Sequence, residues 1–261
     1  MVADEATAGE VPVLWHLKVS HYNEKARWAL DYKRVPHVRR AVVPGRHAEV
    51  AKQLTNAATL PVLVLDGRAI GDSTQIIEAL EARYPRPPLY PADAGERRRA
   101  LELEDYFDEE LGTHTRRLSV HHMLPDREVL LGAFFQDLTG ARRRAMSAAY
   151  PAVRQAMTSA LEIDDRTVAE AFEQLRRARE RFRAELQPSG YLVGSAFTVA
   201  DLTLASLLAP LVAPEQFPYP QPQRGHPSFA PLEEALAEDG LADWTREIYA
   251  RHRGRSAEVS G

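Results

Sequence analysis

The N-terminal third of the chain alternates short apolar runs with segments whose apolar positions repeat at helical spacing. This pattern predicts strands at residues 13–17, 37–43, 60–65 and 68–70, and helices at residues 23–34, 49–54 and 73–84. A strand–helix–strand start requires a parallel crossover, whereas the Asp66-Gly67 turn joins the last two strands as an antiparallel hairpin. We therefore predict an α/β domain over residues 10–85, with a mixed four-stranded sheet and helices on both faces.

The rest of the chain carries only helical patterns, which begin after a proline-rich linker over residues 86–95. We expect helices at residues 96–118, 127–135, 141–161, 167–186, 199–211, 232–236 and 241–251, and a loop at residues 216–226. The segment 199–211 is apolar on nearly all sides, which is typical of a helix at the centre of a domain. These patterns predict an all-helical C-terminal domain over residues 96–253.

The composition is that of an ordinary globular protein, with 44% hydrophobic and 27% charged residues among 261. The formal net charge of -4 gives no reason to expect nucleic acid as a partner. The longest apolar stretch, residues 202–213, is shorter than the about 20 residues that span a bilayer, so we expect no membrane partner. Residues 1–10 are polar and acidic rather than signal-like, and we expect a cytoplasmic location.

The chain contains no cysteine, which excludes disulfides, protein thiolate nucleophiles and cysteine-ligated metals. His121 and His122 are adjacent, so they point apart on a helix, and we predict no metal site there. The arginine runs at residues 97–99 and 142–144 are most simply solvated helix faces paired with nearby carboxylates.

Three motifs stand out along the chain. "VSHYNEKARWAL" follows the first strand, "TLPVL" and "IGDSTQIIEAL" enclose the hairpin, and "YLVGSAFTVADLTLASLL" opens the central helix. In the last motif Thr198 and Asp201 have the spacing of a capping box, which is a structural device at a helix start. Together the motifs resemble the glutathione S-transferase family, and the first is similar to that of bacterial, serine-type, theta- or phi-like enzymes. The resemblance implies a thioredoxin-like βαβαββα domain followed by a helical bundle domain.

The resemblance also implies a glutathione site in the N-terminal domain. Pro61 would follow a cis peptide bond, which leaves the amide and carbonyl of Leu60 free to pair with a peptide-like thiol. Ser73, at a helix start, would hold the γ-glutamyl carboxylate of glutathione, and Asp72, where the family commonly has Glu, would hold its ammonium. The residues alone leave open a trans proline at an edge strand and an ordinary helix cap.

Three further positions are available for the glycine carboxylate of glutathione, namely Lys52, Gln53 and Thr59. The family often has Lys or Gln at the place of Thr59, and Lys52 is equally well explained as a plain surface residue.

Ser20 stands where the resembled enzymes have their catalytic serine. Its hydroxyl would donate to the glutathione sulfur, and the helix that it begins would add positive potential, so that both favour the thiolate. The residues alone also allow Ser20 to be only a helix cap. Tyr22 and Asn23 are near enough in sequence to replace it at the sulfur.

The acceptor site is expected between the two domains. We predict that Tyr22, Asn23, Tyr106, Glu110 and His114 line this substrate pocket. The segment 125–165 is longer than the family minimum, and it either enlarges the pocket or covers it.

The function that the resemblance implies is a glutathione S-transferase acting in detoxification. Glutathione would be the cosubstrate, without a metal, and its thiol would attack a small electrophile or a peroxide. The family commonly forms homodimers, and we expect one. The alternative is a non-catalytic binding or regulatory protein of the same fold, for glutathione or another low-molecular thiol.

Overall fold

The N-terminal domain is built on a four-stranded mixed sheet. The computed structural model describes residues 10–261. The strands are β1 (Val13–His16), β2 (Val38–Ala41), β3 (Val62–Leu65) and β4 (Arg68–Gly71), in the order β2-β1-β3-β4. β1 runs parallel to β2 and antiparallel to β3, and β3 runs antiparallel to β4. Asp66 and Gly67 both have positive φ, which suits a two-residue hairpin turn. The predicted sheet is confirmed.

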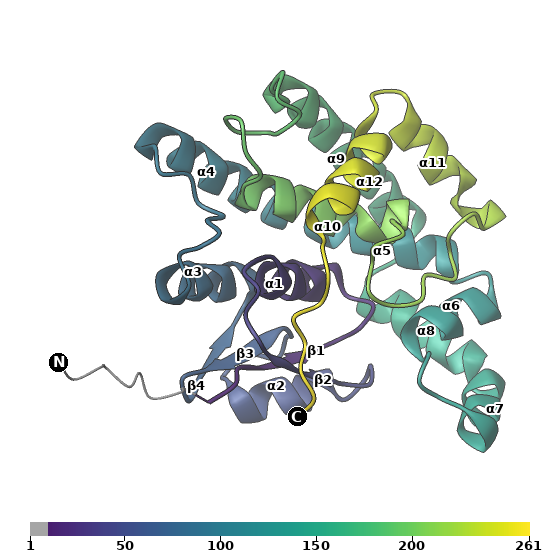
Figure 1. Cartoon of the computed structure of the whole chain (residues 1–261). Helices are drawn as coiled ribbons and strands as arrows, with labels where there is room; N and C mark the ends of the chain where they lie inside the picture. Colours follow the sequence, from purple (N-terminus) through teal and green to yellow (C-terminus); the bar gives the residue numbers. More distant parts are fainter. Residues whose placement is uncertain (1–9) are drawn as a thin grey trace.

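Three helices cover this sheet, as the apolar pattern predicts. They are α1 (His21–Tyr32), α2 (His47–Leu54) and α3 (Ser73–Arg83). α1 and α3 lie side by side on one face and α2 lies on the other (Figure 1). Leu14 and Leu63 pack into the main core beneath α1 and α3, whereas Val62 packs with Ala51 of α2 in a small second core. Successive side chains of β3 therefore point to opposite faces of the sheet, and both faces are buried.

The C-terminal domain is all helical, as predicted. Its helices are α4 (Ala94–Glu110), α5 (Gly112–Met123), α6 (Arg127–Phe134), α7 (Gly140–Ala148), α8 (Tyr150–Ala160), α9 (Asp165–Glu185), α10 (Val199–Val212), the 3-10 turn η1 (Pro227–Phe229), α11 (Ala230–Ala237) and α12 (Leu241–His252). α10 is buried along nearly its whole length and packs against α1, α4, α5 and α12. It is the central helix that its apolar composition predicts, and it joins the two domains.

The start of α10 is closed by the predicted capping box. The Asp201 carboxylate accepts from the Thr198 amide at 2.8 Å and from the Thr198 hydroxyl at 2.9 Å. Its other oxygen accepts from the Leu192 amide at 2.8 Å. Asp201 is fully buried, so these bonds satisfy donors that no water reaches.

Two predicted helices are each divided in two. The predicted helix 96–118 breaks at Leu111, between α4 and α5. A Cβ on Gly112 would lie 2.0 Å from the Tyr22 hydroxyl, so this glycine allows α1 to approach the break. The predicted helix 141–161 breaks between α7 and α8, because Pro151 lies in the first turn of α8 and disfavours helical backbone before it.

The segment after α12 crosses back to the N-terminal domain, which the sequence did not reveal. It runs from α12 to the β2 edge of the sheet (Figure 1). The Val259 amide donates to the His37 carbonyl at 2.9 Å, and Glu258 forms an isolated parallel bridge with His37. The helical domain predicted to end at residue 253 therefore leaves out a segment that contacts the other domain.

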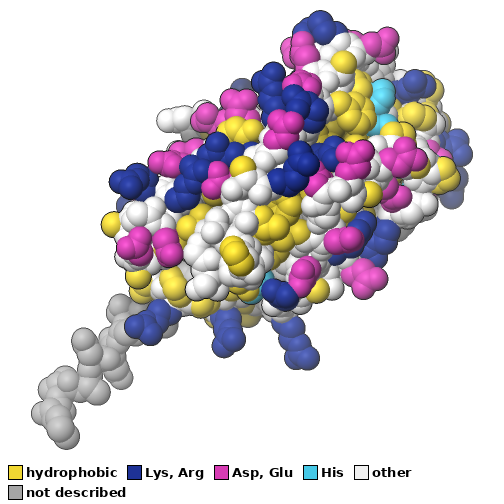
Figure 2. All heavy atoms as spheres, turned by 90° about the horizontal axis from the view of Figure 1, so that it is seen from above, with side chains coloured by type: hydrophobic (Ala, Val, Ile, Leu, Met, Phe, Trp, Pro, Cys, Tyr) yellow, Lys and Arg dark blue, Asp and Glu magenta, His cyan; other side chains and the backbone are white. Residues whose placement is uncertain are grey.

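Charged side chains of both signs alternate over the face of the molecule seen in Figure 2. Each predicted arginine run includes an ion pair with a nearby carboxylate: Arg99 pairs with Glu102 at 3.1 Å, and Arg143 pairs with Glu128 at 3.0 Å. These two arginines are paired but half-buried, and the other four arginines of the two runs are exposed to solvent.

No helix within residues 10–261 is long and apolar enough to cross a membrane. The sequence shows no signal-like pattern in residues 1–10. Of these, only Glu10 belongs to the described residues.

Candidate active site

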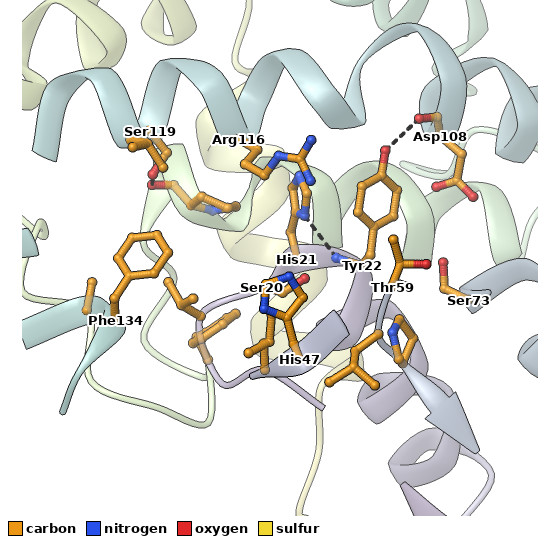
Figure 3. A pocket seen from close by; sticks show the side chains of 18 of the residues that line it. Ser20, His21, Tyr22, His47, Thr59, Ser73, Asp108, Arg116, Ser119 and Phe134 are labelled. Atoms are coloured by element: carbon orange, nitrogen blue, oxygen red, sulfur yellow. Dashed lines mark hydrogen bonds between the residues drawn. The ribbon is translucent and has the colours of Figure 1, made fainter. Parts of the chain in front are cut away.

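A cavity of about 600 Å³ lies where the two domains meet. Its walls come from the β1–α1 loop, the starts of β3 and α3, the helices α4, α5 and α6, and the loop after α10 (Figure 3). The predicted site residues that line it are Ser20, Tyr22, Thr59, Leu60, Pro61, Asp72 and Ser73. Residues from distant parts of the N-terminal domain are thus brought to one side of this cavity.

Ser20 caps the start of α1 and lines the cavity. Its hydroxyl oxygen accepts from the Asn23 side-chain amide at 2.7 Å and from the Asn23 backbone amide at 3.4 Å. Because these two bonds use the acceptor capacity of the oxygen, the hydroxyl proton is left to donate elsewhere. Ser20 is partly buried, so the open direction for that donation is the cavity.

Asn23 does not line the cavity, and its prediction as a pocket residue is wrong. It is completely buried beneath the loop that carries Ser20. Its side-chain amide also donates to the Leu60 carbonyl at 3.0 Å, and its oxygen accepts from the Leu17 amide at 2.9 Å. Asn23 therefore ties Ser20 to the start of β3 and has no group left over for a ligand.

Tyr22 lines the cavity, but its hydroxyl is already engaged. The phenol donates to the backbone carbonyl of Asp108 at 2.8 Å (Figure 3). Burial, together with the nearby Asp108 carboxylate, raises the pKa of Tyr22 well above its ordinary value. The tyrosine fastens α1 to α4 and remains a neutral phenol near neutral pH.

The bond between Leu60 and Pro61 is cis, as the resemblance implies. The expectation that both backbone groups of Leu60 are free needs correction, because its carbonyl accepts from Asn23. The Leu60 amide has no hydrogen-bond partner among the described residues, and it remains available to a peptide-like ligand.

The start of α3 presents a hydroxyl and a capped helix end to the same cavity. Asp72 has a φ of 67°, and its carboxylate accepts from the amides of Thr74 and Gln75 at 2.9 and 3.2 Å. The Ser73 side chain is 3% exposed and lines the cavity. One oxygen of Asp72 is used by the helix cap, which leaves the second oxygen for a cation.

Four other predicted residues do not line the cavity: Lys52, Tyr106, Glu110 and His114. Lys52 and Glu110 are exposed to solvent elsewhere. Tyr106 lies beneath Arg181 of α9, whose guanidinium carbon is 5.4 Å from the ring centroid. Tyr106, Glu110 and His114 were predicted to line the pocket on the assumption of one continuous helix. The face that was predicted to line the pocket packs against α9 instead. The prediction of Tyr106, Glu110 and His114 as pocket residues is therefore wrong.

A buried chain of charged side chains holds the loop before α1. Arg27 donates to the carbonyls of Leu17, Lys18 and Ser20 at 3.0, 3.2 and 3.2 Å. Glu24 accepts from Arg27 at 2.8 Å and from Arg253, beyond α12, at 2.6 Å. All three charged side chains are at most 2% exposed. One guanidinium nitrogen of Arg253 has no partner among the described residues, but the bonds from Arg27 hold three carbonyls of the loop. The long sequence separation of these residues hides the network from sequence analysis.

His21 is buried and bridges α1 to α5. One ring nitrogen lies 2.7 Å from the Gly112 carbonyl and the other accepts from the Tyr22 amide at 2.9 Å, which requires the neutral ring. Burial lowers the pKa of His21 to about 3. The histidine next to Ser20 is therefore uncharged at neutral pH.

We expect His21 to make the protein less stable in mild acid. Below its ordinary pKa of about 6.5 the unfolded histidine binds a proton that the folded one does not, so stability falls as pH decreases. Between pH 7 and pH 5 this one residue should lower the free energy of unfolding by about 2 kcal/mol. Urea unfolding of the wild type and of His21→Gln at both pH values measures the difference. Equal losses in the two proteins would contradict the assignment.

The cavity also contains residues that sequence analysis did not identify as site residues. They are mainly His47, at the start of α2, Arg116 and Ser119 of α5, Phe134 of α6, and Phe217 of the loop after α10. Arg116 and Ser119 are spaced by one helical turn, and this spacing could have indicated a shared face once the break at Gly112 was known. No group of three or more metal-ligating side chains occurs in the described part of the chain.

Comparison with known proteins places both halves of the chain in one family. Residues 14–88 match the glutathione S-transferase N-terminal domain, and residues 144–229 match the glutathione S-transferase C-terminal domain. A maleylpyruvate isomerase from Ralstonia sp. is 36% identical over 92 residues, which are 34% of this chain and 42% of the relative. FtsZ-localized protein A from Caulobacter vibrioides is 26% identical over 137 residues, which are 50% of this chain and 58% of the relative. The chain thus spans about half the length of these relatives.

A solved structure shows the same fold over nearly the whole chain. The glutathione S-transferase from Rhodospirillum rubrum has a TM-score of 0.58 at 22% identity, covering 95% of this chain and 90% of that one.

Proposed function

Because the chain belongs to the glutathione S-transferase family, we propose that it binds glutathione and activates its thiol for attack on a small electrophile. The observation that carries this proposal is the hydrogen bonding of Ser20. Its oxygen is held as an acceptor by Asn23, and its proton is left for a group in the cavity. A hydroxyl held in this way favours a sulfur anion over a neutral thiol, because only the anion accepts a strong hydrogen bond.

The rest of the site offers groups that match the ends of glutathione. Ser73 and the start of α3 suit the γ-glutamyl carboxylate, and the free oxygen of Asp72 suits the ammonium beside it. The free amide of Leu60 can bond the backbone of the cysteinyl residue. Thr59 lies in the cavity wall and can reach the glycine end, whereas Lys52 lies outside the wall.

The chemical step follows from these groups. The glutathione thiol loses its proton to solvent. The lowered pKa of His21 makes its imidazole a weak base, and the raised pKa of Tyr22 keeps its phenol protonated, so that neither takes the proton. The sulfur then forms a bond to the electrophilic carbon, and a leaving group departs with the bonding pair, or a proton adds to the neighbouring carbon in conjugate addition. With a hydroperoxide, the sulfur attacks the terminal oxygen and the O–O bond breaks. The sulfur is oxidised to a sulfenic acid, the peroxide is reduced, and the alkoxide takes a proton from solvent and leaves as an alcohol. Ser20 stabilises the sulfur anion before the attack.

Isothermal calorimetry with glutathione, followed by assays with chlorodinitrobenzene and cumene hydroperoxide, tests this function. We expect binding in the micromolar to millimolar range and turnover of at least one of the two substrates. Ser73→Ala should weaken glutathione binding by about tenfold, because it removes one hydrogen bond to a carboxylate. No binding of glutathione by the wild type would contradict the proposal.

A non-catalytic binding protein is the second candidate. One observation favours it, namely that the Leu60 carbonyl already accepts a hydrogen bond from Asn23. Glutathione can therefore form fewer backbone hydrogen bonds here than at a strand edge with both groups free. Binding of glutathione without turnover of a broad panel of electrophiles would support it. A homodimer of the family's usual kind is also proposed, and its oligomeric state can be measured by sedimentation.

A further inference from the structure

Within residues 10–261 the cavity wall has one arginine or lysine, and no carboxylate forms an ion pair with it. Arg116 is the sole lysine or arginine among the described residues that line the wall. The two histidines there add no charge at neutral pH, because burial lowers the pKa of His21 and of His47. The arginine is exposed and carries its charge at any physiological pH.

The Arg116 guanidinium is unpaired within the part of the chain that the structure describes. The side chain makes no hydrogen bond or ion pair with any other residue between 10 and 261. The ionisable groups that influence it are Tyr22 and Arg117, and neither supplies a negative charge at neutral pH. By contrast, Arg117, the next residue, donates to the Leu161 carbonyl at 3.1 Å. An unpaired guanidinium facing a cavity is a ready site for a planar anion.

The position of Arg116 separates it from the groups assigned to glutathione. In Figure 3 it lies on α5 between Ser73 and Asp108 on one side and Ser119 and Phe134 on the other. Apolar residues of the cavity wall adjoin Ser119 and Phe134 in the chain: Val120 and Met123 follow Ser119 on α5, and Ala133 precedes Phe134 on α6. Pro210 and Phe217 also line the cavity. Two polar residues of the cavity are bonded within the protein: Ser119 donates to the Pro210 carbonyl at 3.3 Å and Gln221 donates to the Pro214 carbonyl at 3.0 Å. The buried side-chain oxygen of Gln223, also in the wall, has no partner among the described residues.

The acidic residues of the cavity do not reach Arg116. Asp105, Asp108 and Glu109 belong to α4, and Asp108 is already bonded to the buried Lys25 and to Thr74. Asp72 and the Asp108 carboxylate thus lie at the start of α3, whereas Arg116, the one cation among the described residues of the wall, pairs with none of the acidic groups.

We infer that the electrophile carries a carboxylate, or a similar planar anion, which Arg116 binds while the apolar body of the molecule lies against the Phe134 side. This inference rests on the proposed function, because it names the class of electrophile that the same site accepts. In this arrangement Arg116 determines specificity, and Ser20 remains the residue that acts on the sulfur.

A matched pair of substrates tests the inference. 4-Chloro-3,5-dinitrobenzoate and 4-chloro-3,5-dinitrobenzamide share the ring and the leaving group and differ in charge. With each rate divided by its uncatalysed rate, we expect the wild type to prefer the benzoate in kcat/KM. Arg116→Gln should lower kcat/KM for the benzoate by about tenfold or more and leave the benzamide within about twofold. Arg116→Lys should keep most of the preference, and Arg117→Gln should change neither substrate.

Two results would overturn the inference. In the first, Arg116→Gln slows both substrates equally, which would mean that the arginine acts on the thiol. In the second, the wild type shows the same kcat/KM, relative to the uncatalysed rate, for the benzoate and the benzamide.

A binding measurement separates this inference from the proposed function. 3,5-Dinitrobenzoate and 3,5-dinitrobenzamide lack a leaving group, and calorimetry measures their affinities without turnover. We expect tighter binding of the benzoate, weakening with added salt and absent in Arg116→Gln. If that preference is found without turnover, the transferase function fails and the anion site stands. If turnover is found and the affinities are equal, the function stands and the anion site fails.

Discussion

Replacing Ser20 with alanine is expected to lower kcat/KM for conjugation by about 10- to 100-fold, with little change in the affinity for glutathione. A hydrogen bond to a charged group contributes about 1.5–3 kcal/mol, and each 1.4 kcal/mol corresponds to about tenfold in rate. The loss should appear in the chemical step, because the hydroxyl acts on the sulfur anion and the other groups hold the rest of the tripeptide. Steady-state kinetics with glutathione and chlorodinitrobenzene measure it.

Two variants make this result specific to the hydroxyl. Ser20→Thr keeps a hydroxyl at the same place and should retain most of the activity. Asn23→Ala keeps Ser20 but removes the amide that fixes its oxygen as an acceptor, so activity should fall, although less than in Ser20→Ala. An alanine at position 20 that leaves kcat/KM unchanged would contradict the assignment of Ser20.

Replacing Asp201 with alanine is expected to lower the free energy of unfolding by about 3–5 kcal/mol. The substitution leaves the buried amides of Leu192 and Thr198 without acceptors, and each unsatisfied buried group costs about 1–3 kcal/mol. Loss of the helix cap adds about 1 kcal/mol. The effect should be large because α10 is the helix against which both domains pack.

Urea unfolding measures this loss, with two variants for comparison. Asp201→Asn keeps one acceptor oxygen and should lie between alanine and the wild type. Thr198→Ser keeps the hydroxyl and should be close to the wild type. A loss below about 1 kcal/mol in the alanine variant would mean that the bonds at this helix start are not important for stability.

The order of the elements could be predicted because each element depends on a pattern among neighbouring residues. A continuous apolar run along residues 62–65, a helical spacing along residues 73–84 and an Asp-Gly turn between the strands each act within a few residues. The strand predicted to begin at Leu60 begins at Val62 instead, because Pro61 has no amide to donate to the sheet and the Leu60 carbonyl is bonded to the Asn23 side chain. That bond joins residues far apart in sequence, and no local pattern reveals it.

The candidate site could be predicted in part for the same reason. Ser20 and Ser73 begin helices, and helix starts leave recognisable signals. The acceptor side could not be predicted, since its face depends on the break at Gly112 and on where α9 packs. Arg27, Glu24 and Arg253 form a chain that spans nearly the whole sequence. The sequence shows these residues only as ordinary charges.

The central claim is that this fold binds glutathione and stabilises its sulfur as an anion beside Ser20. The most direct test is a pH titration of the thiolate absorbance of glutathione bound to the wild-type protein. The hydrogen bond and the helix dipole together supply about 2–4 kcal/mol, and a shift of two units needs about 2.7 kcal/mol. We therefore predict a pKa of about 6.5 for the bound thiol, against about 8.5 for an ordinary thiol. A bound thiol that titrates at its ordinary pKa would contradict the account.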